Sequence, residues 1–432
     1  MSGDLSTYLT AGYYSVWGTG DAAKIKGWPF AGSGIMQVLT FGNVTQQLVM
    51  TRAGIALRAL VNGVPFEWDY LSGGESESSA GSGGSGWKRV PLAVTLGQPD
   101  ADAPTSGQYR VPLRWDAPIV RWRLHVANRQ PKTGASRGSV DLGGVWAGAR
   151  GVDGAWSGTP TQISGAVSLP SDGSEWVSEW RDEPLDGDRM LAFTYTAPAA
   201  PWSLCGGGWS VTGPIDGTAT ALTTVQSVPL SWWIEAETYA TTPVVAVIGD
   251  SLSCGVGATT PVLDSVLSQW CRAHGALPVH WAASGDHMLG MADGSAWKWT
   301  RWDGLARPDA VLWAVGSNDL ASADLATMRA RFSSVLPIVR ERTDGPIFLA
   351  TISPRDGETG TWETTRRAYN TWLRSRPAGA RAVFEFAAAV SPDDETLIPA
   401  LTSDGIHLTT AGYAAQVAAI ASPLTSPAPV YA

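Results

Sequence analysis

The chain has 432 residues, of which 44% are hydrophobic and 16% charged, and its formal net charge is −9. This composition predicts a folded globular protein of about two to four domains and excludes a disordered chain. The acidic balance argues against a nucleic-acid partner, and no run is apolar and long enough to predict a membrane-spanning helix. Three scattered cysteines predict neither a disulfide framework nor a zinc site, and no secretory signal peptide is expected at the N-terminus.

Residues 1–71 are expected to form a small β module. The segments 35–41 (IMQVLTF), 45–51 (TQQLVMT) and 55–63 (IALRALVNG) are apolar or alternating runs separated by Gly and Asn turns, which is typical of short strands. The Gly/Ser-rich segment 72–86 cannot build a core, so it is predicted to be a linker or a long loop. A module of about 70 residues is near the lower limit for an independent core, which favours oligomerisation or docking.

Several short motifs follow one another in this module. GYY at 12–14 and WP at 28–29 precede VTQ at 44–46, an Arg-containing strand and a Trp-bearing hairpin. In this order they resemble the small β knob of phage tail fibres and tailocin fibres, although FEWDYL (66–71) stands where the knob usually carries a W-x-x-W pair. The resemblance implies a virion-tail or extracellular location, other phage tail proteins as partners and a trimer. The alternatives are an unrelated small β module and, without a virion, a cytoplasmic location.

Residues 87–240 are predicted to form an accessory β-sandwich or jelly roll. The runs 109–115 (YRVPLRW), 119–128 (IVRWRLHVAN), 189–197 (RMLAFTYTA) and 227–237 (SVPLSWWIEAE) alternate apolar with polar residues, and long Gly-rich loops separate them. The segments 121–129 (RWRLHVANR) and 190–198 (MLAFTYTAP) together resemble the β-sandwich that precedes the catalytic domain in some two-domain actinobacterial esterases.

Residues 243–423 change character, because buried strands now alternate with amphipathic helices. The predicted strands are 244–248, 279–283, 310–315, 347–352 and 382–386. This alternation predicts a parallel sheet with helices on both faces. In such a sheet the chemistry lies at the carboxyl ends of the strands.

Capping residues predict where the helices of this segment begin. Thr260, followed by Pro261, is expected to start the first helix. Ser322 is expected to cap a later one, which Pro337 is expected to bend or end. A closing helix is expected from about Thr410.

Polar residues follow the predicted strands in a recurring way. Ser251 follows the first strand, Gly285 the second and Asn318 the third, while Asp404 and His407 lie near the end of the segment. The carboxyl ends of parallel strands meet at one edge of a sheet, so these five residues are expected to converge.

Acyl transfer needs a nucleophile, a base, a group that orients the base, and donors for an oxyanion. Ser251 is the predicted nucleophile and His407 the predicted base. Asp404, three residues before the histidine, is placed to fix its tautomer. The predicted oxyanion donors are the backbone N–H groups of Ser251 and Gly285 and the side-chain amide of Asn318.

These blocks, in this order, resemble the signature of the SGNH (GDSL) hydrolase family. Its serine, glycine, asparagine and histidine correspond to Ser251, Gly285, Asn318 and His407, with Asp404 completing the triad. The resemblance implies a three-layer α/β/α, flavodoxin-like fold and ester hydrolysis through an acyl-enzyme, with no metal or other cofactor. The second block usually carries an asparagine a few residues before its glycine, and this chain has none there.

Other polar and aromatic residues lie near these blocks. His287, Trp297, Trp299 and Trp302 are weaker candidates for substrate contacts, the tryptophans as a platform for a sugar ring. The alternatives are core packing for the tryptophans and a solvated loop position for the histidine. Asp250 and Asp319 are expected to be structural carboxylates that accept loop N–H groups.

Two functions are consistent with the sequence. The first is a serine esterase that removes acetyl or other short acyl groups from a glycan of a bacterial envelope, or acts on a small ester. The second is a receptor- or glycan-binding tail protein whose hydrolase-like domain no longer catalyses. The first is favoured, because all five catalytic positions carry a functional residue.

Overall fold

The structure is a computed structural model of the chain. Between residues 3 and 72 it describes strands alone, and further on it describes 86–93, 106–130, 134–183, 185, 187–196, 203–212, 221–229, 231–343, 345–421 and 423–424. The chain divides into two compact units, Met1–Arg89 with Glu237–Thr241 and Val90–Ala236 with Thr242–Ala432. Among the described residues, no helix has both the length and the apolarity to cross a membrane.

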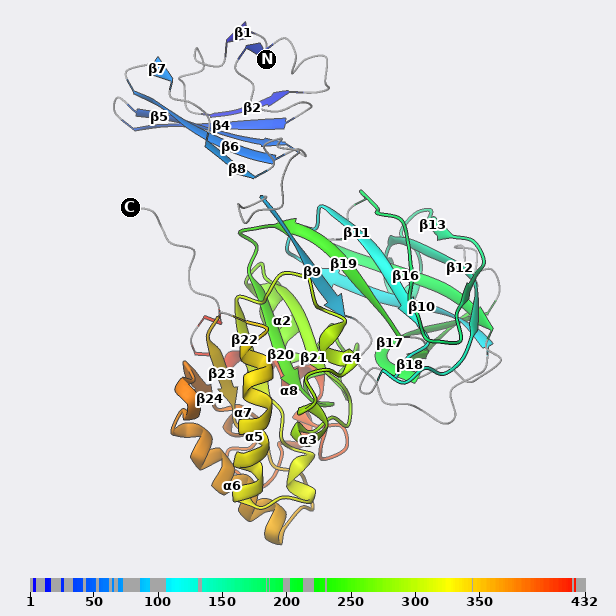
Figure 1. The fold of residues 1–432 in the computed structure, drawn as a ribbon, viewed down its shortest axis with the longest axis vertical. Coiled ribbons are helices and arrows are strands. Elements are labelled where there is room, and N and C mark those ends of the chain that lie inside the picture. Colours follow the sequence, from blue (N-terminus) through cyan, green and yellow to red (C-terminus); the bar gives the residue numbers. More distant parts are fainter. Residues whose placement is uncertain are drawn as a thin grey trace. The chain divides into compact units, whose positions relative to one another are not determined.

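The first unit contains an antiparallel sheet (Figure 1). Its strands are β2 (Gly12–Val16), β4 (Gly34–Phe41), β5 (Val44–Thr51), β6 (Gly54–Val61), β7 (Val64–Pro65) and β8 (Asp69–Ser72). The order is β2-β4-β5-β6-β7, with β8 also paired to β6. The three strands predicted between 35 and 63 are therefore confirmed. Residues 73–85 of the predicted linker lie outside the described residues, and the knob resemblance stays a prediction.

Two further sheets follow, and the strand pairs recorded in them are antiparallel. The larger has the order β13-β12-β16-β10-β17-β18, with β14 paired to β12, and the smaller has the order β15-β11-β19-β9. The larger comprises β10 (Ser106–Trp115), β12 (Val140–Ala149), β13 (Thr161–Ser164), β14 (Val167–Leu169), β16 (Gly187–Thr196), β17 (Ser203–Thr212) and β18 (Ala221–Pro229). The smaller comprises β9 (Trp87–Ala93), β11 (Arg121–Ala127), β15 (Trp176–Val177) and β19 (Ser231–Tyr239). The predicted β-structure is confirmed here, whereas a jelly roll and the predicted domain boundaries stay predictions.

The last region is built on a parallel sheet with the order β21-β20-β22-β23-β24. Its strands are β20 (Val244–Gly249), β21 (Leu277–Ala282), β22 (Ala310–Ala314), β23 (Ile347–Ala350) and β24 (Ala382–Phe384). In chain order this is 2-1-3-4-5, the order of flavodoxin-like sheets. The predicted parallel α/β region is therefore confirmed. β20 lies between β21 and β22, and the loops that follow these three strands contribute to the site described below.

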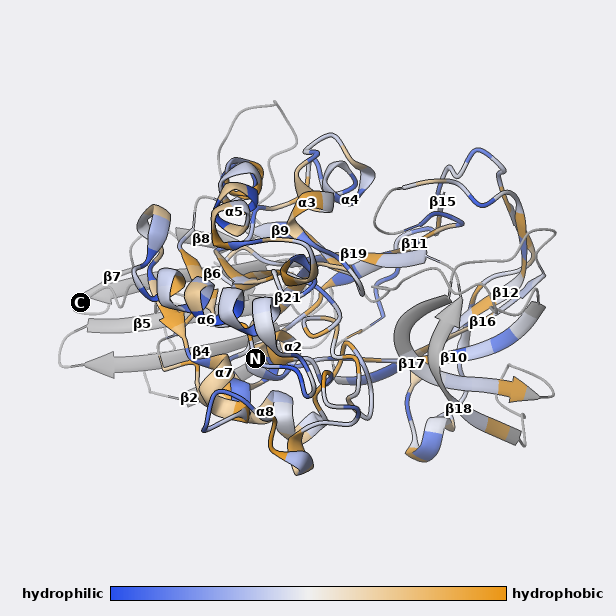
Figure 2. Ribbon diagram, turned by 90° about the horizontal axis from the view of Figure 1, so that it is seen from below, coloured by the Kyte–Doolittle hydropathy of each residue, from blue (hydrophilic) through white to orange (hydrophobic). Residues whose placement is uncertain are grey.

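Helices cover both faces of this sheet (Figure 1). They are α2 (Val266–Ala273), α3 (Met288–Met291), α4 (Trp297–Thr300), α5 (Leu325–Arg340), α6 (Gly360–Arg374), α7 (Phe386–Val390) and α8 (Thr410–Ala418). Figure 2 shows both hydrophilic and hydrophobic residues along α5 and α6, as expected for helices with one face on a core. Side chains of β20 alternate between the two cores: Val244 and Ile248 pack in one, Val245 and Val247 in the other.

Two of the predicted helix starts are wrong. The first helix begins at Val266 with Ser265 as its cap, not at Thr260, because Val262 has a φ of +71° and its N–H bonds to the carbonyl of Cys254. A left-handed residue cannot continue a right-handed helix.

The cap of α5 is Asp324, whose carboxylate accepts the N–H of Thr327, and not Ser322. This helix contains Pro337 and continues to Arg340. The closing helix α8 begins at Thr410 as predicted, with the Thr409 hydroxyl accepting the N–H of Gly412.

Candidate active site

The nucleophile loop begins where the central strand β20 ends. Gly249 closes this strand, and a Cβ on Gly249 would lie 1.8 Å from the hydroxyl oxygen of Ser253, so no side chain fits there. The chain then turns, and Ser251 is 8% exposed at the carboxyl edge of the sheet. A buried strand thus holds the Ser251 hydroxyl at the edge where the other loops end.

His407 and Asp404 reach the same point from the loop before α8. His407 Nε2 lies 3.1 Å from Ser251 Oγ, and His407 Nδ1 lies 2.7 Å from Asp404 Oδ2. Asp404 Oδ1 also accepts the backbone N–H groups of Ile406 and His407, at 2.9 and 2.7 Å. Burial raises the pKa of Asp404, but the hydrogen bonds from His407 and the backbone outweigh it and leave that pKa lowered. The carboxylate therefore stays ionised next to the imidazole.

The predicted oxyanion donors lie on the loops after the two strands that flank β20. Gly285 follows β21 and has a φ of +70°, a conformation that favours glycine. Asn318 follows β22, and its Nδ2 donates to the carbonyl of Asp286 at 2.8 Å. This bond joins the second and third loops, and it leaves one Nδ2 hydrogen for another acceptor. The assignment of Ser251, Gly285 and Asn318 as donors stays a prediction.

A buried aspartate is adjacent to each predicted donor: Asp250, Asp286 and Asp319. Asp250 Oδ1 accepts the N–H of Leu252 at 3.0 Å, and Asp319 Oδ2 accepts the N–H of Met288 at 2.8 Å. The prediction that a loop N–H is accepted is confirmed for Asp250, whereas Asp319 accepts the N–H of the first residue of α3. The bond between Asp319 and Met288 connects the loop after β22 to helix α3, which follows the loop after β21.

Two of these aspartates form ion pairs. Asp286 pairs with Lys298, and both side chains are almost fully buried. Asp319 Oδ1 pairs with Arg331 at 2.9 Å. Buried ion pairs of this kind are costly to break, so they hold the loops in one arrangement. Asp250 differs from both, because burial dominates its environment and raises the pKa of its carboxyl to about 7.

Arg355 is a site neighbour that the sequence analysis missed. It follows β23, and its Nε donates to Ser317 Oγ at 3.1 Å while its Nη2 donates to Asn318 Oδ1 at 2.8 Å. A signal was available, because the segment after the fourth parallel strand must reach the same edge as the other loops.

The predicted sugar platform is wrong for two of its three tryptophans. Trp299 is fully buried, its indole N–H donates to the carbonyl of Met291, and Trp302 is 7% exposed. Both pack in the hydrophobic core, as the alternative of core packing predicts. Trp297 and His287 are both half-buried, and their predicted substrate contacts stay predictions.

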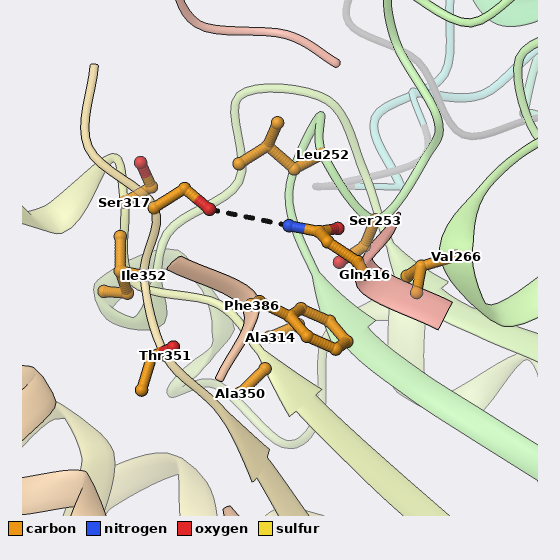
Figure 3. A pocket seen from close by; sticks show the side chains of 11 residues that line it. Leu252, Ser253, Val266, Ala314, Ser317, Ala350, Thr351, Ile352, Phe386 and Gln416 are labelled. Atoms are coloured by element: carbon orange, nitrogen blue, oxygen red, sulfur yellow. Dashed lines mark hydrogen bonds between the residues drawn. The ribbon is translucent and has the colours of Figure 1, made fainter. Parts of the chain in front are cut away.

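A small cavity lies directly behind the nucleophile loop (Figure 3). Leu252, Ser253 and Phe386 are among the residues that line it, and Gln416 Nε2 donates to Ser353 Oγ at 3.5 Å. Its volume is about 30 Å³. This is enough for about one or two water molecules.

The model of the GDSL-like Lipase/Acylhydrolase family matches residues 247–415. No curated protein matches the chain.

Three solved structures illustrate the similarity. A lipolytic G-D-S-L protein from Veillonella parvula is 14% identical with a TM-score of 0.36, covering 42% of this chain and 96% of that one. A family two carbohydrate esterase from Clostridium thermocellum in complex with cellohexaose is 13% identical with a TM-score of 0.36, covering 77% and 97%. The family two carbohydrate esterase from Cellvibrio japonicus is 16% identical with a TM-score of 0.33, covering 77% and 96%.

The family match begins within β20 and ends within α8. It therefore includes all three members of the hydrogen-bonded chain, Ser251, His407 and Asp404, and both flanking loops. The chain thus carries a GDSL-like lipase/acylhydrolase domain over residues 247–415 and is an ester hydrolase of the SGNH type.

Proposed function

We propose that the protein removes short O-acyl groups, acetyl above all, from a glycan of a bacterial surface through an acyl-enzyme on Ser251. The observation that carries the proposal is the hydrogen-bonded chain from Ser251 Oγ to His407 and from His407 to Asp404. A serine hydroxyl is a weak nucleophile alone and becomes a strong one beside such a base.

In the first half of the reaction, Ser251 Oγ attacks the ester carbonyl carbon while His407 Nε2 takes the hydroxyl proton. Asp404 remains ionised and stabilises the imidazolium that forms. The carbonyl oxygen becomes an oxyanion, which accepts hydrogen bonds from N–H groups in the loops of Ser251, Gly285 and Asn318. The imidazolium then gives its proton to the alcohol oxygen of the glycan, the ester C–O bond breaks, and the acyl group stays on Ser251.

In the second half, a water molecule attacks the acyl carbon and gives one proton to His407 Nε2. The bond between the acyl carbon and Ser251 Oγ breaks, and the imidazolium returns a proton to that oxygen. The products are a carboxylic acid and the free serine, so the cycle needs no other reactant.

One feature of the site supports a large, polymeric substrate. The His407 and Asp404 side chains are 22% and 50% exposed, so the triad lies at an open surface that a polymer can approach.

The N-terminal resemblance to a tail-fibre knob supports a setting in a phage virion tail, outside the bacterial cell, with other tail proteins as partners. We propose a trimer on the same ground. Light scattering of the full-length protein tests this point, because a monomeric mass at micromolar concentration contradicts the trimer.

The decisive experiment follows the turnover of 4-nitrophenyl acetate, butyrate and octanoate and the release of acetate from O-acetylated polysaccharides, for wild type and Ser251→Ala. We expect kcat/KM to be highest for acetate and to fall by at least ~10⁴-fold in Ser251→Ala. If wild type turns over none of these esters but binds the polysaccharides, the protein is a non-catalytic glycan-binding protein and the proposal is wrong.

A further inference from the structure

Arg355 donates two hydrogen bonds to the loop that contains Asn318. The residue is half-buried and comes from the loop after β23. Its Nε donates to Ser317 Oγ at 3.1 Å, and its Nη2 donates to Asn318 Oδ1 at 2.8 Å. Consecutive residues of one loop are therefore held by the planar fork of a single guanidinium group, which is rigid and always charged.

The partners of the Asn318 amide leave it only one orientation. Its Oδ1 faces the Arg355 guanidinium, which can only donate, and its Nδ2 faces the carbonyl of Asp286, which can only accept. If the amide flipped, an oxygen would face a carbonyl oxygen and an NH₂ group would face a guanidinium. Either contact is repulsive, so the flipped state is disfavoured at both ends of the amide.

We propose that Arg355 is the positioning residue of the oxyanion hole, and that it keeps an Asn318 N–H, and not its Oδ1, turned toward the developing oxyanion. This inference rests on the proposed function. The bond from Arg355 also polarises the amide, because withdrawing electron density from Oδ1 makes the Nδ2 hydrogens better donors. Arg355 acts through Asn318 and does not touch the substrate.

Two other roles are conceivable for Arg355, and each makes a different prediction. If it only tethers the loop, its loss lowers the stability of the fold without changing kcat. If it binds the substrate, its loss raises KM and adds to the loss caused by removing Asn318. A positioning role lowers kcat, leaves KM unchanged, and has no effect once the Asn318 amide is gone.

The test is a double-mutant cycle with Arg355→Met, Asn318→Ala and the double variant, assayed on 4-nitrophenyl acetate. We expect Arg355→Met to lower kcat by ~10–100-fold with KM changed less than about threefold, and to add less than about threefold in the Asn318→Ala background. Arg355→Lys, which keeps the charge but carries its donors on a single nitrogen and lacks the planar fork, should fall in between. Arg374→Met is the matched control, because Arg374 also makes two bonds, to Glu385 on the surface, and should keep wild-type kcat.

A binding measurement without turnover complements the cycle. Methylboronic acid forms a tetrahedral adduct with a reactive serine, and calorimetry should show ~10-fold weaker binding to Arg355→Met than to Arg374→Met. Unchanged kcat and boronate affinity in Arg355→Met, a multiplicative loss in the double variant, or a rise in KM alone would each overturn the inference. Wild type without turnover, or full activity in Ser251→Ala, would instead refute the proposed function, so the two failures are distinguishable.

Discussion

Gly257 lies directly against His407. A Cβ on Gly257 would lie 3.0 Å from the Cβ of His407 and 2.8 Å from the carbonyl oxygen of Leu408. Gly257 belongs to the loop that begins at Ser251, and its φ is +90°. The nucleophile loop and the histidine loop therefore approach each other as closely as they do because this position has no side chain.

Replacing Gly257 by Ala should separate His407 from Ser251. We expect kcat to fall by ~10–100-fold, since a displacement of about 1 Å in a catalytic group has an effect of this size. Gly304→Ala is the matched control: Gly304 has a φ of +83°, and a Cβ there would meet nothing within 4 Å, so this variant tests the backbone strain alone. Steady-state kinetics of both variants decide the question, and equal kcat values would show that the contact is unimportant.

Replacing Asp404 by Asn should keep the loop and impair the base. An Asn oxygen can still accept the N–H groups of Ile406 and His407, but the charge that stabilises the imidazolium is lost. We expect kcat to fall by ~10³–10⁴-fold. Asp393→Asn is the control, because Asp393 also accepts two loop N–H groups but contacts no histidine among its recorded partners. If both variants lose activity equally, Asp404 has only a structural role.

Replacing Asn318 tests the oxyanion hole. Asn318→Ala should lower kcat by ~10²–10³-fold with little change in KM, because the donor is used in the transition state. Asn318→Asp should be more impaired than Asn318→Ala, because a carboxylate beside the carbonyl of Asp286 brings negative charge to the place where the oxyanion forms. Steady-state kinetics with 4-nitrophenyl acetate measure both. An Asp variant more active than the Ala variant would remove Asn318 from the oxyanion hole.

The sequence was sufficient to predict the order of buried strands and the convergence of polar loops in the hydrolase region. Both depend on local properties: apolar runs between glycines, and the rule that parallel strands end at one edge. Ser251, His407 and Asp404 could be found in this way, because each follows or precedes a regular element.

The contacts that hold these residues depend on long-range packing, and no local pattern marks them. Arg355 reaches Asn318 across 37 residues of sequence. The start of α2 differs from the one that Thr260 and Pro261 predict, because Val262 bonds to Cys254 in the nucleophile loop and takes a left-handed conformation there. The alternation of aromatic and cationic residues around Trp299 is compatible with both a sugar platform and core packing. The pairing of the neighbouring Lys298 with the buried Asp286 is the long-range contact that distinguishes them.

Asp250 should make the fold less stable as the pH rises. Its side chain is 1% exposed, and its Oδ2 has no hydrogen-bond partner among the described residues. Burial raises its pKa from 3.8 to about 7. The group is therefore protonated in the folded protein at a pH where the unfolded chain is already ionised. Its contribution is fully present below pH 3.8 and is lost between pH 3.8 and about pH 7.

Asp250→Asn removes this titration with an isosteric side chain that can still accept the N–H of Leu252. Relative to wild type, its free energy of unfolding should rise between pH 4 and pH 7 by an amount on the order of 4 kcal/mol. Urea denaturation across this range measures the difference. Asp309→Asn is the control, because Asp309 also accepts a backbone N–H, from Val244, but is exposed. A difference that does not change with pH would mean that Asp250 is already ionised in the folded protein.

His125 lies between two carboxylates in the accessory β-region. Its Nδ1 is 2.9 Å from Glu175 Oε2, and its Nε2 is 3.1 Å from Glu235 Oε2, so both ring nitrogens face an acceptor. Arg123 pairs with the same Glu235 oxygen at 2.6 Å. Burial lowers the pKa of His125, but the hydrogen bonds and charges of Glu175 and Glu235 outweigh it, and the pKa is raised above 6.5.

A raised histidine pKa stabilises the fold below pH 6.5, and this stabilisation is lost as the pH rises through the higher pKa of the folded protein. In His125→Gln, which cannot be charged, the loss of unfolding free energy relative to wild type should be largest below pH 6.5 and shrink above it. His274→Gln is the control, because His125 stacks on Trp233 and His274 likewise stacks on Trp270, but the hydrogen bond of His274 is to the Trp270 carbonyl and not to a carboxylate. Urea denaturation of both variants from pH 5.5 to 9 separates them. A deficit in His125→Gln that is constant over this range would show that the imidazole is neutral between the two glutamates.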